Sequence, residues 1–154
     1  MKARVAASIV LALGLTAGMS GCTLLTPQDT LYIKESAHGV NGTVGKIDIR
    51  NAVIISDSKG TVGNLVVTFV NNEDKAHYLS VQHGSKTLSV AIPAYGVKKV
   101  GRDGATRVQF DSLDAKPGSL TDVYFNYAGV TGTQLQVPVL SSTFPGYEDY
   151  APSK

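Results

Sequence analysis

The segment GNLVVTFV, residues 63–70, decides the fold class that this sequence predicts. Its β-branched and aromatic residues favour an extended strand. Successive side chains of a strand point to opposite faces, so both faces of this strand would be largely apolar. A strand of this kind is typical of the centre of a sheet. One face would carry Leu65, Val67 and Phe69, and the other Val66, Thr68 and Val70.

Similar short runs occur on both sides of this segment, separated by Gly, Asn, Asp and Pro at intervals of about ten residues. Helical periodicity is nowhere sustained, so the sequence predicts an all-β fold. About eight strands at this spacing favour a Greek-key β-sandwich of the cupredoxin or immunoglobulin-like kind, with a closed barrel as the alternative. The expected strands are residues 46–56, 63–70, 76–82, 87–92, 97–100, 106–110, 120–127 and 134–139.

The expected strand at residues 46–56 has an irregular pattern. Ile47 and Ile49 alternate with Asp48 and Arg50, which indicates a strand that is buried on one face and solvated on the other. Asn51 then falls on the apolar face, where a polar side chain is out of place. We therefore expect a β-bulge at this residue.

The N-terminus carries the three parts of a secretory signal. Lys2 and Arg4 flank the start of an apolar run over residues 5–15, and residues 16–21 are mostly small. A membrane-spanning helix needs about 20 apolar residues, and this run has roughly half that number. We therefore expect residues 1–21 to be a signal peptide that is cleaved.

Cys22 is the only cysteine, so the chain has no internal disulfide. The stretch MSGC, residues 19–22, resembles the lipobox of bacterial lipoproteins, in which small residues precede the modified cysteine. The resemblance implies cleavage before Cys22 and attachment of diacylglycerol to its thiol. Two or three acyl chains, such as palmitate, anchor a protein stably. We expect a lipid anchor on the extracytoplasmic face of the cell membrane, with an ordinary secretory signal as the alternative.

These patterns divide the chain into four parts. Residues 1–21 are the signal peptide, and residues 22–41, which lack periodicity, are the lipidated N-terminus and a tether. Residues 42–140 form the β-sandwich domain. Residues 141–154 contain prolines and no alternation, so we expect a flexible C-terminal tail, although its tyrosines could dock on another surface.

The charge of the mature chain is close to neutral. Without Lys2 and Arg4, the 14 basic residues fall to 12 and equal the 12 acidic residues. No cluster of Lys or Arg remains that could neutralise a row of phosphates, which argues against nucleic acid as a partner. The expected partners are the membrane, through the lipid anchor, and an envelope protein or glycolipid.

Three blocks of the sequence resemble the periplasmic copper chaperones called PCu(A)C, a cupredoxin-like sandwich family. They are residues 63–72, residues 91–96 with the sequence AIPAYG, and the closing strands in residues 120–139. The signal, together with residues 39–45 and 48–52, resembles the related actinobacterial surface lipoproteins of the LpqE type. The first resemblance covers about half of the chain and implies the sandwich fold.

The same resemblance implies where copper would bind. Family members hold Cu(I) with methionines and histidines, including a late His-x-Met motif, because thioethers and imidazole suit this ion. Here the only methionines are Met1 and Met19, both inside the expected signal, and the late motif reads RVQ at residues 107–109. A guanidinium donates no lone pair, and an amide oxygen is a hard ligand. We therefore expect the scaffold to be retained without copper or any other cofactor.

Three histidines remain, His38, His77 and His83. On one straight strand, His77 and His83 would share a face but lie about 20 Å apart, too far to bind one ion. A divergent copper or metal chaperone that uses these two histidines is the alternative to a domain without metal.

Carboxylates occur mainly in expected turns, where they commonly cap backbone amides. The sequence has no Gly-x-Ser-x-Gly elbow, phosphate loop or His-Glu-x-x-His motif. These features argue against an enzyme and for a non-catalytic binding or scaffolding lipoprotein of the cell envelope. A sandwich that encloses an apolar ligand is a weaker hypothesis. The turn carboxylates are Asp57, Glu73, Asp74, Asp103 and Asp114.

Overall fold

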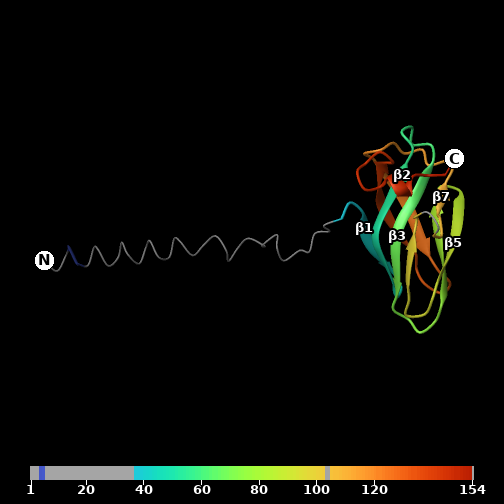
Figure 1. Cartoon of the computed structure of the whole chain (residues 1–154). Helices are drawn as coiled ribbons and strands as arrows, with labels where there is room; N and C mark the ends of the chain where they lie inside the picture. Colours follow the sequence, from blue (N-terminus) through green and yellow to red (C-terminus); the bar gives the residue numbers. More distant parts are fainter. Residues whose placement is uncertain (1–3, 6–36, 103–104, 154) are drawn as a thin grey trace. The chain divides into compact units, whose positions relative to one another are not determined.

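The computed structural model describes residues 4–5, 37–102 and 105–153 (Figure 1). Cys22, nearly all of the expected signal peptide and most of the expected tether lie outside these residues. None of the helices in the described part of the chain is long and apolar enough to cross a membrane. The compact unit Glu35–Lys154 contains the strands. They are β1 (Val40–Val44), β2 (Ile47–Ser56), β3 (Gly63–Asn71), β4 (His77–His83), β5 (Lys86–Ile92), β6 (Val97–Val100), β7 (Gln109–Phe110), β8 (Leu120–Asn126) and β9 (Thr133–Ser141).

The strands form one continuous sheet in the order β5-β4-β8-β9-β2-β3-β6, folded into two facing layers. The first layer contains β1, β2, β3 and β6, with the short β7 beside β3, and the second contains β5, β4, β8 and β9. Residues 54–56 of β2 join the layers by pairing in parallel with β9. The predicted all-β sandwich is confirmed. Because the single sheet is nearly closed on itself, the fold also comes close to a barrel, which is the alternative prediction.

β3 lies at the centre of the first layer, between β2 on one side and β6 and β7 on the other, as its two apolar faces predict. Leu65, Val67 and Phe69 belong to the buried core, where the rings of Phe69 and Phe125 meet with their centroids 6.1 Å apart. Burying one such side chain contributes roughly 1.5–3 kcal/mol to stability. Since no internal disulfide is available, this packing and the strand pairing hold the domain together.

β2 contains the predicted bulge. Its register against β3 shifts between Arg50 and Val53, and Asn51 has a φ of 53°. The side-chain oxygen of Asn51 accepts a hydrogen bond from Gly39 N at 2.8 Å, which helps to hold this left-handed conformation. The prediction that β2 is solvated on one face is correct only up to Arg50, because residues 52–56 are all fully buried.

One strand, β1, is absent from the sequence predictions, and the extents of β7 and β9 differ clearly from the predicted ones. β1 begins at Val40, inside the expected tether, and pairs with β2. Its central Gly42 lets Leu135 approach closely, since an added Cβ would lie 2.8 Å from Leu135 Cδ1. Glycine is rare in strands, so the residue composition of this segment does not indicate a strand. The strand expected at residues 106–110 is reduced to the two residues of β7, and β9 runs to Ser141, just past the expected end of the domain.

Candidate functional site

The position where the family resemblance implies late copper ligands lies at the start of β7. Arg107 precedes this strand, and Gln109 is its first residue, paired with Asn64 of β3. The Gln109 amide binds the backbone of Ser153: Oε1 accepts a hydrogen bond from Ser153 N at 2.9 Å, and Nε2 donates to Ser153 O at 3.1 Å. Arg107 Nη1 donates to the carbonyl oxygen of Ala151 at 3.3 Å. Both side chains therefore hold the C-terminal end of the chain.

The C-terminal segment, residues 142–153, packs on the outer face of the first layer, and Figure 1 shows its red ribbon beside β2 and β7. It starts where Ser142 N donates a hydrogen bond to Ser56 O at 2.9 Å. Near its end it forms a short 3-10 helix, η2 (Glu148–Tyr150). The carbonyl oxygen of Tyr150 accepts a hydrogen bond from Asn64 Nδ2 at 3.0 Å. Asn64 is fully buried, so the segment covers the first layer near the start of β3.

These contacts correct the expectation of a flexible tail at residues 141–154 and agree with the alternative that its tyrosines dock. The ring of Tyr147 lies edge-on to His38, with centroids 5.8 Å apart, and tilted against Tyr150, also at 5.8 Å. His38, expected in the tether, thus lies against the domain. Val53 and Ile55 are fully buried on the same outer face, and burial of such apolar surface offsets the entropy lost when a segment is ordered.

The residues at the implied copper position do not fit Cu(I). Arg107 has no lone pair to donate, and the Gln109 amide oxygen is a hard ligand that already accepts hydrogen bonds from Ser153. The sequence from residue 37 to residue 153 contains no methionine, so this domain supplies no thioether. The site therefore lacks the soft donors that its counterpart in the family is implied to have.

His77, at the start of β4, is engaged within the domain. Its Nε2 lies 2.6 Å from Glu73 Oε2, and its ring packs on the ring of Tyr127 with centroids 4.5 Å apart. Glu73, expected to cap a turn, thus pairs with a histidine instead. A metal ion at Nε2 of His77 would have to compete with Glu73.

His83, at the other end of β4, lies between two backbone carbonyl groups. Its Nδ1 is 2.9 Å from Asp122 O, and its Nε2 is 2.9 Å from Leu113 O. A neutral imidazole donates at only one nitrogen, so both contacts are hydrogen bonds when the ring carries two protons. Since both nitrogens face carbonyl oxygens, neither directs a lone pair towards a site for a metal ion. The geometry gives His83 a structural role, joining β8 to the loop that contains Leu113.

The structure does not bring His77 and His83 together. They occupy the two ends of the seven-residue strand β4, which corresponds to a separation of about 20 Å. Within the described ranges, no group of three or more His, Cys, Asp or Glu side chains could hold a metal ion. A metal site made from these two histidines would require both to leave their present partners.

Asp57 caps the turn between β2 and β3, as predicted for a carboxylate in a turn. Its Oδ1 accepts hydrogen bonds from Thr61 N at 2.8 Å and Val62 N at 3.1 Å, and its Oδ2 accepts one from Thr61 Oγ1 at 2.9 Å. The bond from Val62 is the largest of the effects that lower the pKa of Asp57 below its ordinary value of 3.8. Both oxygens of this carboxylate accept hydrogen bonds within the turn, so its role is structural.

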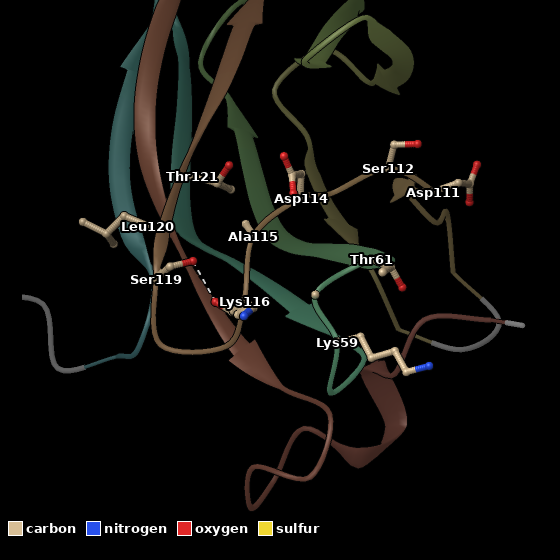
Figure 2. Close-up of a pocket in the computed structure, with 11 residues that line it drawn as sticks. Lys59, Thr61, Asp111, Ser112, Asp114, Ala115, Lys116, Ser119, Leu120 and Thr121 are labelled. Atoms are coloured by element: carbon tan, nitrogen blue, oxygen red, sulfur yellow. Dashed lines mark hydrogen bonds between the residues drawn. The ribbon is translucent and has the colours of Figure 1, made fainter.

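An open groove of about 720 Å³ lies beside the start of β8 (Figure 2). In Figure 2 the loop with Asp114 and Ala115 runs between Thr121 of β8 and the turn with Thr61. Asp111, also in its lining, binds Lys86 Nζ at 2.5 Å, and this hydrogen bond is the main reason that the pKa of Asp111 is lowered. The lining contains hydroxyls, lysines and carboxylates but no His, Cys or Met, so it offers no soft ligand.

The fold defines a β-sandwich of the PCuAC type. The chain is similar to the copper-bound PCuAC domain from PmoF2, with a TM-score of 0.53 and 14% identity over 66% of this chain and 98% of that domain. It is also similar to the apo PCuAC domain from PmoF1, with a TM-score of 0.56 and 12% identity over 66% of this chain and 99% of that domain. The third similar structure is the apo PCuAC domain from PmoF2, with a TM-score of 0.54 and 14% identity over 68% of this chain and 98% of that domain.

The resemblance to the PCu(A)C family is thus confirmed at the level of the fold. No family model matches the sequence, and no curated protein matches it either. In this chain the side chains of Arg107 and Gln109 bind the backbone of its own C-terminal segment.

Proposed function

We propose that this chain is a membrane-anchored lipoprotein of the cell envelope whose β-sandwich binds or scaffolds a partner without catalysing a reaction. The observation that carries the proposal is the contact of Arg107 and Gln109 with Ala151 and Ser153, at the position where the family resemblance implies copper ligands. Side chains that are hydrogen-bonded to a docked segment support a structural use of this position. The near-neutral charge of the mature chain fits a binding domain with no preference for phosphates.

The anchor part of the proposal depends on the MSGC sequence, residues 19–22, and on cleavage of the signal directly before Cys22. Metabolic labelling with an alkynyl fatty acid tests it in intact cells. We expect the native chain to carry the label and to fractionate with membranes, and the Cys22→Ser chain to carry none. Native protein that is found unlabelled in the medium would overturn the anchor.

The binding part of the proposal is tested by titrating the purified chain with Cu(I) in the presence of a competing chelator. We expect no stoichiometric complex, because His77 and His83 are hydrogen-bonded and lie at opposite ends of β4. His38→Ala serves as the matched control, since the His38 ring packs on the rings of Phe144 and Tyr147 and lies outside β4.

A divergent copper chaperone is the second candidate function. The observation that favours it is the copper-bound state of one domain with the same fold. Submicromolar, stoichiometric Cu(I) binding that is lost in His77→Ala or His83→Ala, but not in His38→Ala, would establish it and would replace the first proposal.

A further inference from the structure

The outer face of the second layer carries almost no charge. On β4, β8 and β9 the buried residues alternate with outward ones, among them Tyr78 and Gln82 on β4, Asp122 and Tyr124 on β8, and Gln134 on β9. The other outward positions of these strands and of β5 hold Ser, Thr, Asn, Gln, Ala, Leu or Pro. Asp122 is thus the only charged residue among the outward-facing positions of β4, β5, β8 and β9. The solvated face of an antiparallel sheet is normally polar, so what requires an explanation is the lack of charge.

The outer face of the first layer differs. Asp48, Arg50 and Lys99 lie at outward positions there, and part of that face is covered by the C-terminal segment. The uncharged outer face of the second layer is therefore a property of that layer and not of the domain surface as a whole.

A hollow of about 350 Å³ lies in this face, lined by Gln82, Gly84, Asp122, Tyr124 and Gln134. The hydroxyl end of the Tyr124 ring rests on Gly132, where any added Cβ would collide with it. The absence of a side chain at residue 132 thus lets the ring lie close to the backbone and remain 36% exposed beside the hollow. The hollow combines an aromatic ring with two amide side chains and one carboxylate.

The polar groups around the ring are available to a ligand. Among the residues that the structure describes, the side chains of Asp122 and Gln134 make no hydrogen bond or ion pair, and Gln82 Nε2 makes a single bond, to Gly84 O at 3.2 Å. The backbone beneath them is fixed, because the His83 ring contacts the carbonyl oxygen of Asp122. The strand that carries Asp122 and Tyr124 is therefore held in place while their side chains face outward.

We infer that this hollow binds a neutral glycan chain. Sugar hydroxyls both donate and accept hydrogen bonds, as amide side chains do, whereas Lys and Arg only donate. The C–H faces of a sugar ring carry partial positive charge and are attracted to the negative face of an aromatic ring such as Tyr124. A surface without Lys or Arg offers nothing to a phosphate or an anionic headgroup. The chemistry of the face is thus complementary to an uncharged, hydroxyl-rich ligand.

A protein partner fits the same face less well. Protein interfaces have a continuous apolar centre, but the exposed Leu120 and Tyr78 lie roughly 25 Å apart along the strands, given about 3.3 Å per residue. Leu120 and Thr121 instead line the groove of Figure 2, directly before Asp122 in β8. A linear glycan that lies along β8 would reach from the hollow towards this groove.

The inference names a partner class for the proposed binding function, but it does not depend on the lipid anchor. The test uses the full chain in detergent, captured on immobilised mannan, arabinogalactan, amylose and cellulose, with alginate as the anionic control. We expect retention on at least one neutral polysaccharide and none on alginate. Retention should weaken roughly tenfold in Tyr124→Ala and persist in Tyr124→Phe, which keeps the ring. Gln134→Ala, on the exposed surface, is a second variant that leaves the core untouched.

Tyr95→Ala is the matched control, because Tyr95 is 74% exposed but belongs to the turn between β5 and β6. Circular dichroism of each variant reports whether it is folded. The glycan site would be overturned if the native chain bound none of the four neutral polysaccharides, or if folded Tyr124→Ala and native chains were retained equally. Capture of a protein in intact cells by a photocrosslinker placed at residue 134 would also overturn the glycan site. None of these outcomes bears on fatty-acid labelling of Cys22 or on the Cu(I) titration, so the two proposals fail separately.

Discussion

The phenol oxygen of Tyr127 accepts a hydrogen bond from the backbone amide of Lys46 at 3.0 Å, although 81 residues separate them. Lys46 lies in the tight turn between β1 and β2, and Tyr127 directly follows β8 of the other layer. This bond therefore joins the two layers at one end of the sandwich. The ring of His77 packs on the same tyrosine.

We expect Tyr127→Phe to lower the free energy of unfolding by about 1 kcal/mol, because the Lys46 amide loses its partner while the ring is kept. Urea unfolding followed by circular dichroism measures the change. Tyr78→Phe is the control, since Tyr78 is 76% exposed and its side chain makes no hydrogen bond within the described part of the chain. Equal stability of the Tyr127→Phe and native proteins would show that water replaces the bond.

The docked C-terminal segment should depend on Gln109. We expect Gln109→Ala to destabilise the protein by about 1 kcal/mol and to speed hydrogen exchange of the Ser153 amide, which loses its acceptor. Gln136→Ala removes an outward amide of β9 that has no hydrogen-bond partner among the described residues, and it should leave both quantities unchanged. Unchanged exchange at Ser153 in Gln109→Ala would mean that the pairing is not maintained in solution.

Asparagine at position 51 should stabilise the bulge in β2 for two separate reasons. Asn51→Ala removes the acceptor of the Gly39 amide and places a residue with a Cβ at a φ of 53°, so we expect a loss of about 1–2 kcal/mol in stability. Asn51→Gly loses the same bond but relieves the backbone, so it should cost less. Thermal unfolding of the two variants gives the order, and a more stable Asn51→Ala protein would contradict this account.

The lowered pKa of Asp57 predicts a change in stability with acid. A carboxyl whose pKa is lowered by folding adds stability above its unfolded value of 3.8, and this stability is lost as the pH falls through the folded pKa. Unfolding measured below about pH 4 should therefore be less pH-dependent in Asp57→Asn than in the native protein. Asp74→Asn is the control, because the Asp74 side chain accepts no such hydrogen bonds from the residues that the structure describes. An identical pH profile for Asp57→Asn and the native chain would be evidence against the cap.

The features that the sequence determines by itself are those whose cause is local. The alternation in residues 63–70 is enough to predict the central strand β3, because strand side chains alternate wherever the strand lies. A polar Asn51 on an apolar face indicates the bulge, and Asp57 in a turn indicates the cap, because both signals can be recognised in the local sequence. The missing copper donors are likewise visible in the sequence, since no methionine follows residue 19.

Only the tertiary structure decides which distant segments meet. The C-terminal segment has no periodicity of its own, and its order comes from a surface made by Asn64, Arg107 and Gln109, which lie far earlier in the chain. The hollow at Tyr124 likewise needs Gln82 and Gln134 from neighbouring strands. Local propensity does not predict these long-range contacts. They depend on the order of the strands and on packing between the layers, and both are properties of the whole chain.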